Sequence, residues 1–348
     1  MTAYSNSRRL RYFLLYAFYL IVLVEIASRS YLTIVENASF LKPETILYKY
    51  YPELGRLMQE RVDGDDGYFD ILFLAGSVLN AEWGEIEKLL LEKLSNRLDR
   101  EIRIHNLSQG AHTSLDSYYK YRHLSDKKFD LVLFYHGINE VRANNSPDSI
   151  FKNDYSHYAW YRSVNLIERH KELTYLAFPY VFARGFMNLR DRFDPPELLP
   201  MYIPKYEWVQ YGGAIKTAFA LATNLQKIID IALEKGEPIL LATFAFHVPE
   251  NYSSERFKAK SLDYGRHMSE VEVWGEPRNV ITGLLTHNRV ITDAAMESDV
   301  MLVDMARLIP GDGAHFNDIC HLTYAGAESF ADNLLPFVDQ VLGRMNPR

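Results

Sequence analysis

The sequence predicts an α/β fold, a three-layer sandwich in which a five-stranded parallel sheet lies between two layers of helices. Apolar segments of strand length recur along the chain, and helical segments separate them. Such alternation is typical of a parallel sheet that is covered on both faces. Polar residues also follow several predicted strands, at the edge where open α/β sheets bind their ligands.

The composition is that of an ordinary folded protein. The chain has 348 residues, of which 48% are hydrophobic and 24% charged, so we expect one sizeable domain with appendages. A net charge of -7 gives no general attraction to phosphate backbones, and we expect no nucleic-acid partner. Cys320 is the single cysteine, which excludes an internal disulfide and leaves the compartment open.

The first segment, residues 1–30, predicts a short cytoplasmic tip and a single membrane anchor. Three arginines within residues 8–11 precede residues 12–27, which are apolar except for Glu25. A helix of roughly 16 to 20 residues spans about 24 to 30 Å, enough for a thin bilayer. The arginines favour a cytoplasmic N-terminus, which places the remaining chain in the periplasm or outside the cell. A cleaved signal peptide and a buried helix stay open as alternatives.

Residues 31–68 predict a connector, and residues 69–348 a single α/β domain. Strands are predicted at residues 69–75, 101–108, 129–136, 238–248 and 300–309, and the first of them is continuously apolar except for Asp70. The intervening helices are predicted at residues 81–98, 115–124, 214–234 and 280–296.

Residues 141–211 break this alternation and predict an inserted cap. The segment is rich in tyrosine, phenylalanine and tryptophan, interleaved with prolines and arginines. A structureless loop of this length would be unusual within a compact domain. The aromatic side chains suit an acyl or sugar pocket, the membrane surface, or a small core of the cap itself, and these possibilities stay open.

Candidate catalytic residues lie after the first predicted strand and near the C-terminus. Ser77 follows the first strand, where its hydroxyl is exposed at the start of a helix. A serine hydroxyl becomes a nucleophile when a neighbouring base removes its proton, and a histidine such as His321 is suited to that step near neutral pH. Asp318, three residues earlier, is placed to accept a hydrogen bond from the imidazole. Ser77 as a helix cap and Asp318 with His321 as a structural pair are the alternatives.

Three donors are candidates for stabilising the oxyanion that forms when a serine attacks an ester. They are the backbone amides of Ser77 and Gly110 and the side-chain amide of Asn139. Asn139 as a plain turn residue is the alternative. The remaining histidines lack the spacing of metal ligands, so we expect no metal and no other cofactor.

Four segments of the chain resemble, in their order and spacing, the four sequence blocks of the SGNH or GDSL-type hydrolase family. They are residues 75–77, Gly110, residues 137–139 and residues 318–321. The resemblance covers roughly residues 69–140 and 237–343 and implies a flavodoxin-like sandwich with a serine nucleophile. Ala75 and Gly76 stand where the family name would have glycine and aspartate, and Glu140 replaces the more frequent aspartate.

The expected function is that of a serine esterase or deacylase acting on an acylated carbohydrate or a small ester through an acyl-enzyme intermediate. An O-acyltransferase that modifies a cell-envelope polysaccharide is one alternative, and a non-catalytic binding protein of the same fold is another. The expected partners are an acyl ester and, through the N-terminal helix, a membrane. The sequence leaves the substrate and the oligomeric state open.

Overall fold

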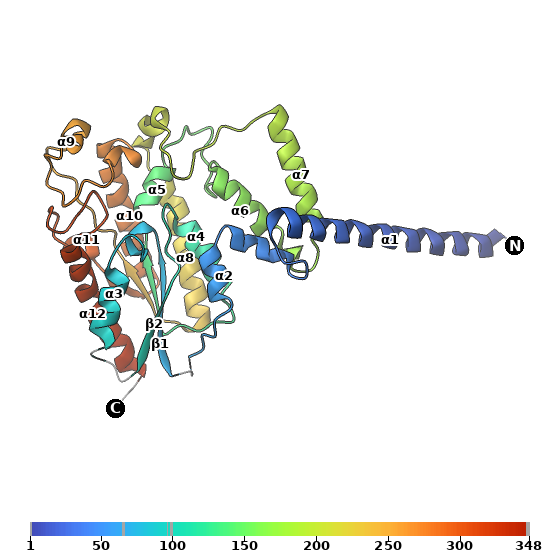
Figure 1. Cartoon of the computed structure of the whole chain (residues 1–348), viewed down its shortest axis with the longest axis horizontal. Helices are drawn as coiled ribbons and strands as arrows, with labels where there is room; N and C mark the ends of the chain where they lie inside the picture. The colour runs from blue at the N-terminus through green and yellow to red at the C-terminus, as the bar shows by residue number, and fades with distance from the viewer. Residues whose placement is uncertain (1, 65–66, 96, 98–99, 346–348) are drawn as a thin grey trace. The chain divides into compact units, whose positions relative to one another are not determined.

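The computed structural model describes residues 2–64, 67–95, 97 and 100–345 of the chain (Figure 1). Two sets of residues form separate compact units. The smaller unit combines Met1–Gly55 with Trp160–Glu197, and the larger unit combines Arg56–Ala159 with Leu198–Arg348. The predicted strands and the predicted site residues all belong to the larger unit.

Five parallel strands form the sheet of the larger unit, as the sequence predicts. The strands are β1 (Tyr68–Ala75), β2 (Glu101–Asn106), β3 (Leu131–Tyr135), β4 (Ile239–Ala242) and β5 (Met301–Val303). Their order across the sheet is β2-β1-β3-β4-β5, and every neighbouring pair is parallel. Each residue of β1 after Tyr68 is buried, because both faces of the sheet are covered.

Helices form a layer on each face of this sheet (Figure 1). The main helices are α3 (Ile86–Ser95), α4 (Ser114–Arg122), α8 (Thr217–Lys235), α10 (Pro277–Glu297) and α12 (Tyr324–Met345). On one face α8 packs between α4 and α10, and on the other face α3 packs against α12. Shorter helices are α2 (Pro52–Leu57), α5 (Ile138–Ala143), α9 (Ser254–Lys258) and α11 (Met305–Leu308). The prediction of a three-layer α/β fold is confirmed.

The last two strands are shorter than their predicted spans, 238–248 and 300–309. The strand pairing ends two residues after β4, because the amide of Phe244 donates to the side-chain oxygen of Asn288, Oδ1, at 2.6 Å. After β5 the chain forms the short helix α11. The apolar pattern continues beyond each strand because Phe244 and Ala245 after β4, and Met305 and Ile309 after β5, remain buried outside the sheet.

The first helix of the sheet-containing unit begins later than predicted. The predicted span was 81–98, but α3 starts at Ile86 because a turn around Asn80 comes first. Asn80 Oδ1 accepts from the amide of Glu82 at 2.8 Å and stabilises this turn. Residues 96 and 98 of the predicted span lie outside the described residues. The C-terminal helix α12 was not among the predicted helices.

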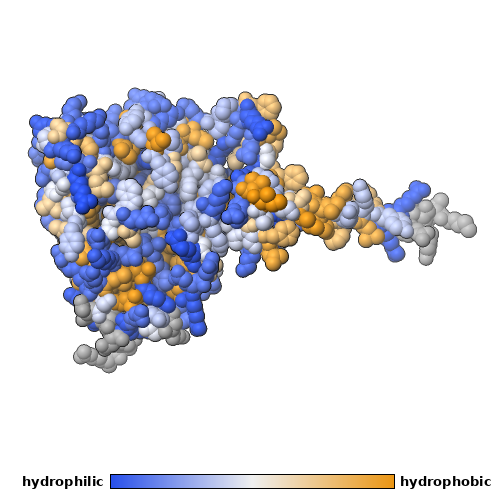
Figure 2. All heavy atoms as spheres, in the orientation of Figure 1, coloured by the Kyte–Doolittle hydropathy of each residue, from blue (hydrophilic) through white to orange (hydrophobic). Residues whose placement is uncertain are grey.

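A long apolar helix, α1 (Thr2–Glu36), begins the smaller unit. Among the described residues, its segment Arg9–Glu36 is the one helix long and apolar enough to cross a membrane. The large apolar side chains between residues 10 and 24 are exposed, and Figure 2 shows apolar surface along this helix. The unit also contains α7 (Phe178–Phe193), nearly all of α6 (Ala159–Arg169), and the 3₁₀ helices η1 (Pro43–Lys49) and η3 (Lys171–Thr174).

The predicted insertion, residues 141–211, is divided between the two units. Residues 160–197 group with the N-terminal helix, and the two flanking parts belong to the unit that contains the sheet. Tyr50 and Tyr51 pack edge-on against Trp160, with ring centroids 5.3 and 6.0 Å apart. Aromatic residues of the insertion therefore build part of the core of the smaller unit.

Candidate active site

Ser77 lies just after the carboxyl end of β1, which pairs with β2 on one side and β3 on the other. The strand ends at Ala75, and Ser77 begins a short 3₁₀ helix, η2 (Ser77–Leu79). A Cβ atom on Gly76 would lie 3.0 Å from the side-chain nitrogen of Asn139, tighter than most such contacts. The close approach of this amide therefore explains why glycine precedes the serine.

His321 and Asp318 come together with Ser77 in the structure. Ser77 Oγ lies 3.1 Å from His321 Nε2, and His321 Nδ1 lies 2.8 Å from Asp318 Oδ2. Asp318 is fully buried, whereas Ser77 and His321 retain a small exposure of 7% and 4%. Residues separated by 244 positions in the sequence thus form one continuous line of hydrogen-bonding groups.

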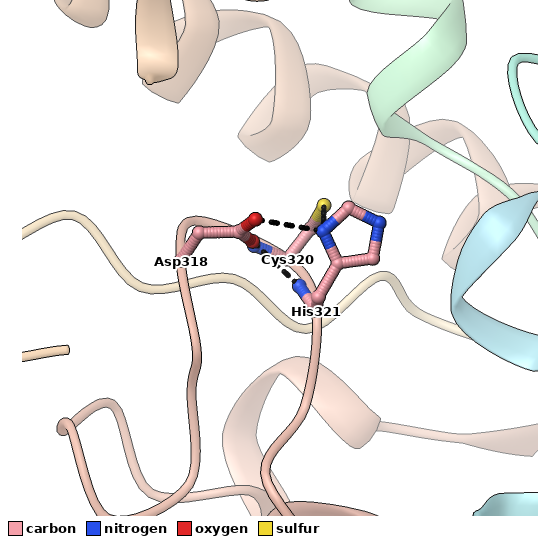
Figure 3. A group of neighbouring side chains, drawn as sticks. All are labelled: Asp318, Cys320 and His321. Atoms are coloured by element: carbon pink, nitrogen blue, oxygen red, sulfur yellow. Dashed lines mark hydrogen bonds and ion pairs between the residues drawn. The ribbon is translucent and has the colours of Figure 1, made fainter. Parts of the chain in front are cut away.

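The loop that carries Asp318 and His321 is held in shape by its own hydrogen bonds. The second carboxylate oxygen of Asp318, Oδ1, accepts from the backbone amides of Cys320 at 2.9 Å and His321 at 2.8 Å. Asn317 closes the loop by donating its backbone amide to the carbonyl of His321 at 2.7 Å. Because both carboxylate oxygens are engaged, the Asp318 side chain has one orientation, which Figure 3 shows.

Cys320 sits between these two residues, and the three side chains form a group that a metal ion could in principle bind. The thiol lies 3.7 Å from His321 Nδ1 (Figure 3). Metal ligation requires a thiolate, but burial, with the Asp318 carboxylate nearby, raises the pKa of Cys320 well above its usual value. His321 Nδ1 is also engaged by Asp318. These three side chains are therefore better suited to holding the His321 imidazole in one orientation than to binding a metal ion.

Asn139 lies at the start of α5, directly after β3. Its Nδ2 donates to the carbonyl of His112 at 2.8 Å, and the same nitrogen lies beside Gly76. A side-chain amide has two N–H groups, so the bond to His112 leaves a second one for a ligand. Asn139 is thus placed next to the candidate nucleophile.

Gly110 lies in the turn that follows β2, and hydrogen bonds tie this turn to the segment after Ser77. Asn80 Nδ2 donates to the carbonyl of Ser108 at 2.8 Å. Asn106 Nδ2 donates to the carbonyl of Leu79 at 2.7 Å. The loops that carry Gly110 and Ser77 are therefore neighbours at the same edge of the sheet.

Two tryptophans that the sequence analysis did not single out surround the imidazole of His321. The ring of Trp83 stacks on it at 5.4 Å and an interplanar angle of 30°, and the ring of Trp274 lies at 6.3 Å. Trp83 remains half exposed, whereas Trp274 is buried. For Trp83, the one feature of the sequence that could have indicated a place near the site is its position six residues after Ser77. No such feature pointed to Trp274.

A buried polar network that could not be predicted from the sequence lies behind the candidate oxyanion donors. Lys120 is fully buried and donates to His112 Nδ1 at 2.8 Å. Glu140 Oε1 accepts from the amide of Ser114 at 2.5 Å, and burial raises the pKa of Glu140 to about 7. These contacts hold the segment of His112, whose carbonyl in turn positions Asn139.

No protein-family model matches the sequence, and no curated protein matches it as a relative. Among solved structures, the chain is similar to a GDSL-like lipase from Bacteroides thetaiotaomicron, at 11% identity over 84% of this chain and 97% of that chain, with a TM-score of 0.44. It is also similar to a carbohydrate acetylesterase family member from Sinorhizobium meliloti, at 12% identity over 79% and 99%, with a TM-score of 0.43. A lipase/acylhydrolase from Enterococcus faecalis shares 13% identity over 80% and 98%, with a TM-score of 0.41.

Proposed function

We propose that this protein is a serine esterase or deacylase of the SGNH hydrolase family, which cleaves ester-linked acyl groups. The observation that carries the proposal is the line of contacts from Ser77 Oγ through the imidazole of His321 to the carboxylate of Asp318. A nucleophile, a base and a group that orients the base are the parts that acyl transfer through a covalent intermediate requires. Two of the four sequence blocks that resemble this family supply these residues, since one ends at Ser77 and the other runs from Asp318 to His321.

In the proposed mechanism, His321 Nε2 accepts the proton of Ser77 as Oγ attacks the ester carbonyl. Asp318 accepts a hydrogen bond from Nδ1, which keeps the lone pair on Nε2 and stabilises the imidazolium that forms. The alcohol leaves with the proton from His321, and an acyl group remains on Ser77. Water then attacks the acyl-enzyme in the reverse sequence and releases the acid.

The proposed oxyanion donors are the amides of Ser77 and Gly110 and the free N–H of Asn139. Ser77 begins η2, so its backbone amide has no partner within that helix. Asn139 donates its other N–H to His112, which fixes the amide before any substrate arrives. Donors that are held in place in advance stabilise developing charge without reorganisation.

The site is proposed to act on the far side of a membrane from the N-terminus. The exposed apolar side chains of residues 10–24 support a transmembrane helix, and Arg9 and Arg11 support a cytoplasmic N-terminus. Protease added to sealed, inside-out vesicles should then leave the catalytic unit intact. Digestion of that unit in such vesicles would reverse the proposed orientation.

The test of activity uses the full chain in detergent, with p-nitrophenyl acetate and longer esters as substrates. The wild-type chain should release p-nitrophenol and form an adduct with a fluorophosphonate probe, and Ser77→Ala should lose both. Turnover that appears only with an added sugar acceptor would assign acyl transfer to an envelope polysaccharide in place of hydrolysis. If a properly folded wild-type chain neither hydrolyses esters nor reacts with the probe, the result would refute the esterase proposal and favour a non-catalytic binding protein of this fold.

A further inference from the structure

Helix α7 of the smaller unit carries an exposed apolar stripe. Phe178, Phe182, Phe186, Leu189 and Phe193 follow one another at spacings of four, four, three and four residues, which places them on one side of a helix. Phe182 and Phe186 are 63% and 70% exposed, and Phe193 is 84% exposed. A row of large apolar side chains of this kind marks a surface that binds something apolar.

Ion pairs on the opposite side of α7 fix which way the stripe faces. Arg184 pairs with Glu36 of α1 at 2.7 Å, and Asp191 pairs with Arg162 of α6. Arg184 and Asp191 are seven residues apart and lie on the side of α7 away from the phenylalanines. The rest of the smaller unit therefore binds the polar side of α7 and leaves the apolar stripe outside.

The N-terminus of α7 is attached to α1 at the point where the exposed apolar run of α1 ends. Glu25 is the first charged residue after that run, and its carboxylate accepts from the amides of Ala177 and Phe178 at 2.9 and 3.0 Å. Arg29 pairs with the same carboxylate at 2.5 Å and donates to the carbonyl of Tyr175 at 2.8 Å. The charge of Glu25 within the apolar helix is thereby balanced by Arg29, and α7 begins beside Glu25.

We propose that the apolar stripe of α7 lies in the boundary between the acyl chains and the headgroups of the bilayer that α1 crosses. The proposal rests on the membrane-spanning role proposed above for α1. Figure 1 shows α7 running across the direction of α1, so a helix α1 that crosses the bilayer leaves α7 along its surface. The attachment at Glu25 puts α7 at the depth where the apolar part of α1 gives way to polar groups.

The charges on α7 fit a lipid surface better than a protein groove. Arg190 and Arg192 are both exposed and lie about 80° to either side of the centre of the stripe, at about 100° per residue. Basic side chains in these positions extend to phosphate groups while their stems cover apolar surface. Phe178 and Phe182 also pack edge-on, with centroids 6.2 Å apart, so they present one rigid apolar surface.

The test places the fluorophore NBD on single cysteines in the full chain, reconstituted at one copy per nanodisc with anionic lipid. Phe186→Cys reports on the stripe, Asn188→Cys on the exposed surface beside it, and Leu20→Cys on α1. The native Cys320 is buried, and the unsubstituted chain measures its background labelling. Quenching by lipids with a doxyl group near the headgroup is compared with quenching by aqueous iodide.

We expect the probe at position 186 to be quenched several-fold more by the lipid-borne doxyl than the probe at position 188, and to be shielded from iodide. If the lipid-borne doxyl quenches the probes at positions 186 and 188 equally and also quenches the probe at position 20, the proposed location of the α7 stripe is wrong. The membrane-spanning role of α1 would stand in that case. Lipid quenching absent at position 20 would refute the membrane-spanning helix and this inference with it. Shielding from iodide without lipid quenching at position 186 would assign the stripe to a protein contact and also overturn the proposal.

Discussion

The substitution Asp318→Asn tests the proposed role of the carboxylate most sharply, because the structure fixes how asparagine would sit. Oδ1 of Asp318 accepts from two backbone amides, at 2.9 and 2.8 Å, and an NH₂ group in that place would face two donors. The asparagine oxygen therefore takes this position, and its NH₂ group points at His321 Nδ1. Nδ1 must then act as an acceptor, which moves the imidazole proton to Nε2.

An imidazole protonated on Nε2 has no lone pair to accept the proton of Ser77, so we expect kcat to fall by about 10³ to 10⁴. KM should change little, because Asp318 is fully buried and lies behind the imidazole. The assay is steady-state hydrolysis of p-nitrophenyl acetate, with the melting temperature measured to show that the variant is folded. A folded variant that retains more than about a tenth of the activity would refute this reasoning.

The chain offers a matched control for this substitution. Asp312 and His315 have the same spacing as Asp318 and His321, and His315 Nδ1 lies 2.7 Å from Asp312 Oδ1. This second pair is partly exposed at the surface. Asp312→Asn should therefore leave kcat unchanged, and a comparable loss in both variants would point to an effect on folding.

Three further predictions concern residues around the site and in the sheet. Asn139→Ala should lower kcat by about 10² to 10³ through loss of an oxyanion donor, and an unchanged rate for p-nitrophenyl acetate would remove Asn139 from the proposal. Gly76→Ala should lower kcat about tenfold, because the added Cβ would lie 3.0 Å from the Asn139 amide and displace it; wild-type kinetics would show that the amide tolerates the shift. Asp70→Asn should lower the free energy of unfolding by about 2 kcal/mol, because the buried carboxylate accepts from His105 and Arg103, and urea titration measures this. Although burial opposes it, hydrogen bonds from His105 and Arg103 lower the pKa of Asp70, so its contribution is present above the ordinary pKa of 3.8 and disappears as the pH falls through the lower, folded value. Equal urea midpoints for wild type and Asp70→Asn at neutral pH would contradict this prediction.

The sheet could be predicted from the sequence because its strands have local patterns: β1, β3, β4 and β5 are apolar runs, and β2 alternates isoleucine with polar residues. Residues 69–75 are continuously apolar except for Asp70, and the structure buries them between two helical layers. The ends of β4 and β5 could not be predicted, because the apolar run continues after the last strand hydrogen bond. The helix α12 was missed although Leu334, Val338 and Val341 have helical spacing, since Pro336 interrupts the pattern.

In the candidate site, too, contacts between residues close in the sequence could be predicted, and contacts between distant residues could not. The spacing of Asp318 and His321 within a single turn made that pair visible in the sequence. The stacking of Trp83 and Trp274 on the imidazole was not visible, because it depends on how loops after different strands meet at one edge of the sheet. The division of the 141–211 insertion between two units likewise depends on long-range packing.

By itself the sequence determined the alternation of strands and helices, the apolar N-terminal helix and the local residue spacings, because these patterns depend on neighbours within a few turns of chain. It contained two aspartate and histidine pairs of identical spacing, at residues 312–315 and 318–321. Only the tertiary structure brings His321 within 3.1 Å of Ser77, while His315 stays with Asp312 at the surface. That choice depends on how the C-terminal loop packs on the end of β1, and a contact across 244 residues leaves no periodic signal in the chain.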